Sequence, residues 1–248
     1  MQNASMEPGD SRYRPFPETR WSLVIRVNEK ENPDRLQLLS DLCQIYWPPV
    51  YAFIRSRNYS PHDAEDLTQG FFEQFLRLDG LSSTDPTRGK LRSFILASVR
   101  NFLSTEVRHA SRQKRGGGVV HVSIDATAGE SRCLQASLTD HLSPEKIFDR
   151  QWAITLLETA IERVSAEYQA RGKEVVFHRL KSFISSSNPP TDSHKIAQDL
   201  GMSETALRVA IHRLRQRYAK ALKETVRDTI DESEDVDAEL KYLMSVFS

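Results

Sequence analysis

The sequence predicts an all-α fold in two small helical domains joined by a flexible linker. Three observations predict it: apolar residues recur at three- and four-residue steps, proline repeatedly follows a helix-capping residue, and strand patterns are scarce. We expect the domains at residues 19–115 and 143–223. Residues 116–142 have weak periodicity and many Gly, Ser and Thr residues, which is typical of a linker. Residues 1–18 are predicted to be a disordered arm, and residues 224–248 a tail.

The first domain opens with helices marked by proline. Asn32-Pro33 and Ser60-Pro61 each place a capping residue before a proline suited to the first helical position. Pro48-Pro49 is expected to end the first of these helices, with a second short helix from Val50 to Arg55. The helix after Pro61 has an apolar stripe formed by Ala64, Leu67, Phe71, Phe75 and Leu78.

Another helix follows from Leu91 and ends in a basic stretch before the glycine triplet Gly116–Gly118. Its predicted inner face consists of Leu91, Phe94, Ile95, Ser98, Val99, Phe102 and Leu103. Its predicted outer face carries Arg92, Arg100, Asn101 and Arg108. Within the linker, alternation from Val119 to Ile124 leaves a short extended stretch open as an alternative.

Ser143-Pro144 opens the second domain in the same way. Its first helix is expected to turn Ile147, Ile154, Leu157, Ile161 and Val164 inward. Its next helix is expected to do so with Val176, Phe177, Leu180, Phe183 and Ile184.

A helix-turn-helix pattern then spans residues 192–217. Gly201 supplies the backbone freedom of a tight turn, and Ser203 can cap the helix that follows. The inner residues of that helix would be Leu207, Ile211 and Leu214. Arg208, His212, Arg213, Arg215 and Arg217 would then point outward, where arginines can meet base edges or phosphates in the major groove. The alternative is a solvated basic helix in an unrelated bundle.

The charge is unevenly distributed. Lys plus Arg and Asp plus Glu number 34 each, so the net charge is zero, which by itself argues against a nucleic-acid binder. However, basic residues dominate 88–115 and 208–223, whereas acids gather in 224–239. The two basic patches and the acidic tail say more about possible partners than the net charge does.

Several classes of protein are disfavoured. Cys43 and Cys133 stand alone and fit a reducing compartment, and no apolar run approaches the roughly 20 residues that span a bilayer. The polar N-terminus does not resemble a signal peptide. The histidines lack the spacing of metal ligands. The glycine triplet is not followed by the Lys-Ser/Thr pair of a phosphate-binding loop. We therefore expect a cytoplasmic protein that is not an enzyme and has no cofactor, metal or membrane partner.

Two stretches resemble the extracytoplasmic-function sigma factors of bacterial RNA polymerase. Asp63–Gln69, followed by Phe71-Phe72, is similar to the polymerase-binding helix of that family. Leu91–Asn101 is similar to the helix that melts and reads the promoter. Residues 143–220 resemble the family's region-four domain, so the resemblance covers about residues 20–115 and 143–220.

The resemblance implies a factor that directs promoter-specific initiation by reading and melting the proximal element and reading the distal element. The implied partners are promoter DNA and core RNA polymerase, at the β′ clamp helices and the β flap. An anti-sigma partner is left open. The competing hypothesis is a stand-alone helix-turn-helix regulator, which would bind duplex DNA as a dimer without polymerase.

The resemblance also implies roles for individual residues. The polymerase-binding residues would be Asp66, Gln69, Phe72 and Glu73, with Phe72 as an exposed aromatic or, alternatively, a core residue. The proximal-element residues would be Arg92, Arg100, Asn101, Arg108, Arg112, Lys114 and Arg115. Asn101 would receive a flipped base, unless it is a surface asparagine. The distal-element residues would be Ser203, Glu204, Thr205, Arg208, His212, Arg213 and Arg215.

The chain also departs from the family pattern. Phe94 stands where tryptophan is common. Ala210 stands at a frequent arginine position, and Val209 stands just before it. The tail extends past the usual end of the family. Its predicted amphipathic helix has an apolar stripe at Leu240, Leu243, Met244 and Phe247. The tail either packs on the fold or screens a basic DNA-binding face as an autoinhibitor.

Overall fold

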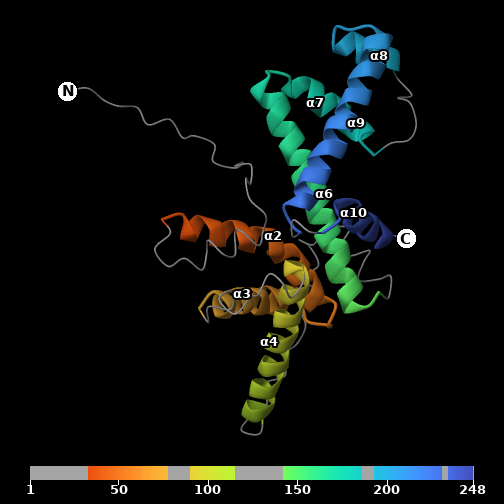
Figure 1. Cartoon of the computed structure of the whole chain (residues 1–248). Helices are drawn as coiled ribbons and strands as arrows, with labels where there is room; N and C mark the ends of the chain where they lie inside the picture. The colour runs from red at the N-terminus through yellow and green to blue at the C-terminus, as the bar shows by residue number, and fades with distance from the viewer. Residues whose placement is uncertain (1–32, 78–89, 115–141, 186–192, 231–233, 248) are drawn as a thin grey trace, which may run out of the picture. The chain divides into compact units, whose positions relative to one another are not determined.

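The computed structural model describes residues 33–77, 90–114, 142–185, 193–230 and 234–247 (Figure 1). Within those ranges the regular structure is helical and contains no strand, which confirms the all-α prediction. The predicted N-terminal arm and nearly all of the predicted linker, including Val119–Ile124, lie outside the described residues. Leu78, the last residue of the apolar stripe predicted after Pro61, lies outside them as well.

The described chain forms a succession of helices. They are α2 (Arg35–Arg55), α3 (Pro61–Arg77), α4 (Leu91–Lys114), α6 (Pro144–Ala170), α7 (Glu174–Leu180), the 3-10 turn η2 (Lys181–Phe183), α8 (Ser193–Asp199), α9 (Glu204–Arg227) and α10 (Val236–Ser245). The chain divides into two compact units. Unit 1 takes its described residues from Leu157–Thr225, and unit 2 from Glu18–Leu156 and Val226–Ser248.

This division differs from the predicted boundary at residue 143. The first half of α6 belongs to unit 2, where the Trp152 ring stacks on Tyr46 with centroids 4.7 Å apart. Phe148 meets the edge of Phe53, and both side chains are fully buried. Large aromatic side chains dominate core energetics, so α6 is anchored to α2 from its first turns.

The helix starts predicted from Ser-Pro pairs are confirmed. At α3, the backbone N–H of Asp63 donates to Ser60 Oγ at 3.1 Å, and the Ser60 hydroxyl donates to the Asp63 carboxylate at 2.7 Å. At α6, the Lys146 N–H donates to Ser143 Oγ at 3.3 Å. The first described helix starts later than predicted, at Arg35 with Asp34 as its N-cap.

The predicted helix break at Pro48-Pro49 is wrong, because α2 continues through both prolines to Arg55. A proline inside a helix costs about 3 kcal/mol. The residues around the pair are buried, and burying each large apolar side chain contributes about 1.5–3 kcal/mol. The buried neighbours are Tyr46, Val50, Ala52, Phe53 and Ile54. Packing along the whole helix therefore offsets the local penalty.

Unit 1 is built around one apolar cluster drawn from α6, α7, α8 and α9. Its buried members include Val164, Tyr168, Phe177, Leu180, Ala197, Leu207, Ile211 and Leu214. The predicted inward faces of α7 and α9 are confirmed, with Val176, Phe183 and Ile184 packed at the edge of the cluster. Along α6, Ile147 and Val164 are buried as predicted, whereas Ile154, Leu157 and Ile161 are half-buried.

Candidate functional site

The helix-turn-helix geometry predicted in unit 1 is present. The turn between α8 and α9 contains Gly201 at φ 63°, a left-handed conformation that favours glycine. The Met202 N–H donates back to the carbonyl of Ala197 at 2.9 Å. Ser203 caps α9 as predicted, because its Oγ accepts from the Ala206 N–H at 3.2 Å.

The first turns of α9 present their polar residues to solvent. The exposed members of the predicted distal-element set are Ser203, Glu204, Thr205, Arg208, His212 and Arg213. The Arg208 side chain is 77% exposed and has an ion-pair partner one turn back, Glu204, at 3.9 Å. Arg215 departs from the prediction. It is half-buried, and its Nε donates to the Phe183 carbonyl at 2.9 Å, so it ties α9 to η2.

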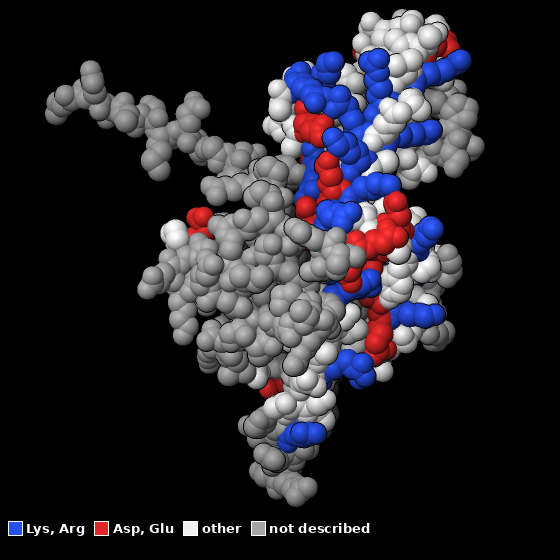
Figure 2. Space-filling view, in the orientation of Figure 1, with Lys and Arg blue, Asp and Glu red and all other residues white. Residues whose placement is uncertain are grey.

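A charged groove of about 490 Å³ runs along the later turns of α9 in unit 1. Its charged lining residues are Glu167, Arg171, Arg213, Arg217, Lys220 and Glu224. Arg217 donates to Glu167 at 2.9 Å. Figure 2 shows Lys and Arg gathered over this part of the molecule, with acids among them. Arg171 lies just beyond the end of α6 and belongs to none of the predicted sets of site residues.

The polymerase-binding residues predicted on α3 divide into two groups. Asp66, Gln69 and Glu73 are exposed and lie three and four residues apart, hence on one helix face. The Gln69 amide donates to the Glu73 carboxylate at 3.3 Å. His62 Nδ1 lies 3.4 Å from Asp66 Oδ2. Asp66, Gln69 and Glu73 thus form a compact polar face on α3.

The interpretation of Phe72 as an exposed aromatic is wrong, since it is 5% exposed and packs in the core of unit 2. Its ring stacks on Trp47, with centroids 5.8 Å apart and planes 12° apart. Trp47 is 37% exposed, so the aromatic that reaches the surface beside α3 comes from α2. Trp47 was not among the predicted surface residues, because the expected helix break directly follows it.

The proximal-element residues predicted on α4 differ in their surroundings. Asn101 and Arg108 are exposed, as predicted for the outer face. Arg100 is also exposed and lies 3.8 Å from Glu145 at the start of α6, a carboxylate that Arg57 approaches at the same distance. The side chains of Arg112 and Lys114, and all of Arg115, lie outside the described part of the chain.

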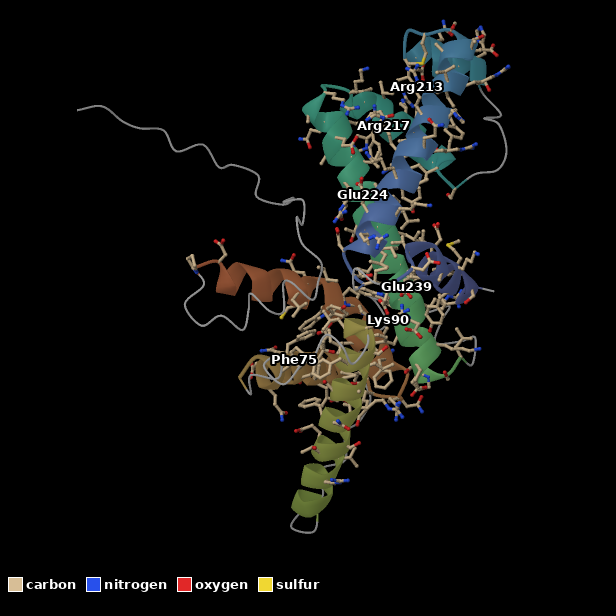
Figure 3. All side chains as sticks on the ribbon, viewed as in Figure 1. Phe75, Lys90, Arg213, Arg217, Glu224 and Glu239 are labelled. Atoms are coloured by element: carbon tan, nitrogen blue, oxygen red, sulfur yellow. The ribbon has the colours of Figure 1, made fainter. Side chains whose placement is uncertain are left out.

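Arg92 is not on the outer face of α4, which corrects the prediction. Its side chain is 9% exposed and donates through Nη1 to the carboxylate of Glu239 on α10. Its Nε lies 3.8 Å from Asp149 Oδ1, and its guanidinium lies over the Tyr242 ring at 4.5 Å. Lys90 donates to the second oxygen of the same Glu239 carboxylate. Figure 3 shows Lys90 and Glu239 beside each other.

Tyr242 completes this cluster. Its hydroxyl donates to Asp149 Oδ2 at 2.6 Å. Burial raises the pKa of Tyr242 to about 12, with the hydrogen bond to Asp149 and the negative charge of Asp149 adding to the effect. The phenol is therefore held in its neutral, hydrogen-donating form across the physiological range.

The predicted tail helix is confirmed as α10, but its buried face differs from the predicted stripe. Val236, Glu239 and Leu243 are buried, whereas Met244 and Phe247 are exposed and Leu240 is half-buried. Glu239 lies three residues after Val236 and four before Leu243. That spacing was the signal in the sequence that this acid belongs to the inner face.

The described residues contain no group of three or more His, Cys, Asp or Glu side chains that could hold a metal ion. Within the same ranges, no helix combines the length and apolar character needed to cross a bilayer.

A comparison with known families matches residues 42–113 to the model for sigma-70 region 2. The matched stretch runs from α2 through α3 and along α4, and so includes the exposed face of α3 and the predicted promoter helix. The match supports a sigma factor of the sigma-70 family, a class of non-catalytic initiation factors that bind RNA polymerase and recognise promoters. No curated protein and no solved structure matches the chain.

Proposed function

We propose that the chain is a sigma factor of the extracytoplasmic-function type, acting in the cytoplasm on core RNA polymerase and promoter DNA. The observation that carries the proposal is the region 2 match over residues 42–113, followed in the same chain by a capped helix-turn-helix with a basic outer face. A polymerase-binding module and a duplex-reading module in this order fit a factor that contacts two promoter elements.

The docking face of α3 is assigned to Asp66, Gln69 and Glu73. They are exposed, share one face of the helix and present acids and an amide to a partner. Trp47 adds a partly exposed aromatic from α2, and aromatic residues are enriched among the side chains that dominate binding energy. The β′ clamp helices of the polymerase are the proposed partner of this surface, and the β flap that of unit 1.

The DNA-reading residues are assigned to two helices. On α4, Asn101 is exposed and can read the edge of a base that has left the stack, while Arg100 and Arg108 bind phosphates. On α9, Ser203, Thr205 and Arg208 lie at the exposed N-terminal end, the part of a recognition helix that meets base edges. Val209 is 43% exposed and gives that surface an apolar contact for a thymine methyl group.

Co-elution of the full chain with bacterial core RNA polymerase tests the proposal. We expect stoichiometric binding by the wild type and at least a tenfold loss of affinity, about 1.4 kcal/mol or more, when Asp66→Ala and Gln69→Ala are combined. Both side chains are exposed, so the substitutions leave the core intact. Phe72→Ala is unsuitable here, because removing a buried ring would unfold unit 2.

Gln74→Ala is the matched control, since Gln74 is an exposed polar residue of α3 that lies five residues after Gln69 and so about 140° around the helix from it. It should bind polymerase like the wild type. If the wild type passes through unbound yet binds duplex DNA tightly on its own, the chain is a stand-alone regulator. Equal losses from Gln74→Ala and from the pair would remove the assigned docking face.

A further inference from the structure

A buried carboxylate on α10 is bound by two cations at the start of α4. Glu239 is 3% exposed, and Lys90 and Arg92 each donate to a different oxygen of its carboxylate. All three residues belong to unit 2, although 147 positions separate Arg92 from Glu239 along the chain. Burying a carboxylate is unfavourable unless it is paired and hydrogen-bonded, and here both oxygens have a cationic donor.

The second acid of the cluster, Asp149, comes from the first half of α6. It approaches Arg92 at 3.8 Å and accepts from the Tyr242 hydroxyl at 2.6 Å. The cluster therefore sets two cations, Lys90 and Arg92, against two carboxylates. Its formal charge is balanced only while α10 supplies Glu239, and without α10 it carries one excess positive charge.

Apolar contacts hold α10 only lightly. The helix has ten residues, of which Val236 and Leu243 are its buried apolar side chains, whereas Met244 is 55% exposed. Isolated helices shorter than about 12 residues are marginal in water. The charged contacts of Glu239 and the Tyr242 hydrogen bond are therefore a large part of what keeps α10 on unit 2.

We propose that α10 is a reversible cover on α4, and that Lys90 and Arg92 bind backbone phosphates of DNA once α10 leaves. Lys and Arg bind carboxylate and phosphate oxygens through the same N–H donors. The two oxygens of Glu239 occupy the positions that two oxygens of a phosphodiester would take. Arg100 and Arg108 add two exposed cations further along α4, at roughly 80° and 160° around the helix from Arg92, and cations along the length of the helix favour DNA as the occupant. The inference rests on the proposed function in assigning DNA contact to α4.

The test compares the full-length wild type with Glu239→Gln, using a short fluorescent DNA duplex without polymerase. Glu239→Gln keeps the shape of the side chain and removes its charge. We expect tighter binding at low salt and a steeper fall of log affinity with log salt concentration. Each cation freed for a phosphate contact changes that slope by about 0.9, so two change it by about 1.8.

A second pair of substitutions identifies the surface responsible. Lys90→Gln with Arg92→Gln should cancel the gain when added to Glu239→Gln, because the triple variant keeps neither the buried acid nor the two cations. Asp237→Asn is the matched control, because it removes an exposed acid from the first turn of the same helix. An equal gain from Asp237→Asn would show a general charge effect and overturn the cover.

Tyr242→Phe provides a milder variant in case Glu239→Gln loses helical content by circular dichroism. It removes one hydroxyl, leaves every charge of the cluster, and should raise DNA affinity by a smaller factor.

The sigma-factor proposal and the cover proposal can fail separately. A gain on opening α10 without polymerase co-elution would remove only the sigma-factor proposal. Polymerase binding with unchanged DNA affinity and salt slope in the folded variants would remove the cover.

Discussion

The first turns of α4 and α9 carry the same kind of residue in opposite situations. The Arg92 side chain on α4 is 9% exposed and is held by carboxylates from α6 and α10. The Arg208 side chain on α9 is 77% exposed, with an ion-pair partner on its own helix. A basic run in the sequence therefore gives the charge of a helix but not its availability. Availability depends on whether a distant segment supplies acids to cover it.

The largest expected difference between the two helix starts is in the free energy of unfolding lost when Arg92 or Arg208 is removed. Arg92→Ala leaves Glu239 as a buried carboxylate with one cation fewer, and truncating one partner of a buried pair costs about 3–5 kcal/mol of unfolding free energy. Arg208→Ala removes an exposed pair and should stay within about 0.5 kcal/mol. Urea denaturation followed by far-UV circular dichroism measures both values.

A double change controls for the buried charge. Arg92→Met combined with Glu239→Leu removes both members of the pair and should recover most of the stability that Arg92→Ala loses, since well-packed apolar residues can replace a buried ion pair. Similar costs for Arg92→Ala and Arg208→Ala would mean that α10 does not cover Arg92 in solution.

Local signals in the sequence predicted most helix starts and most inner faces. Ser60, Ser143 and Ser203 each cap the helix that they were expected to cap. The inner stripe of α9, Leu207, Ile211 and Leu214, is buried as predicted. These features depend on neighbours within one or two turns, and such neighbours are visible in the sequence itself.

Features that depend on distant residues could not be predicted. Pro48-Pro49 breaks a helix by local propensity, but packing of α2 against α3 and α6 outweighs that preference. Phe72 reads equally well as a surface or a core aromatic until Trp47 is seen to cover it. Arg92 was expected on the outer face of α4 because it is charged, although it lies three, seven and eleven residues before the buried Ile95, Val99 and Leu103. Only the fold brings Glu239 onto it.

A smaller effect is expected at the turn that aims α9. Gly201 has a φ of 63°, and a side chain added there meets no atom within 4 Å, so the cost of Gly201→Ala is conformational and not steric. A non-glycine residue in that region costs about 1–2 kcal/mol. Thermal unfolding should show that loss, together with weaker distal-element binding. Gly70→Ala is the helical control, since its added methyl group would lie in ordinary contact with Phe102 at 3.5 Å.

The smallest expected effect is a dependence of stability on pH, which Tyr242 confers on the contact between α10 and the start of α4. The pKa of Tyr242 is raised to about 12, first by burial and then by Asp149, whereas an unfolded tyrosine titrates near 10. The neutral phenol is thus favoured in the folded state. Its contribution to stability is complete below pH 10 and is lost as the pH rises from about 10 to 12.

Alkaline titration of the phenolate absorbance, as the difference between wild type and Tyr242→Phe, isolates this one group. Asp149→Asn should lower the pKa of Tyr242, because it removes the negative charge beside the hydroxyl. The pKa should nevertheless stay above 10, because burial is the largest cause of the shift and remains. Loss of α10 from unit 2 over the same pH range would show that the hydroxyl helps to hold the cover. A midpoint near 10 in the wild type would place Tyr242 in water and α10 away from α4.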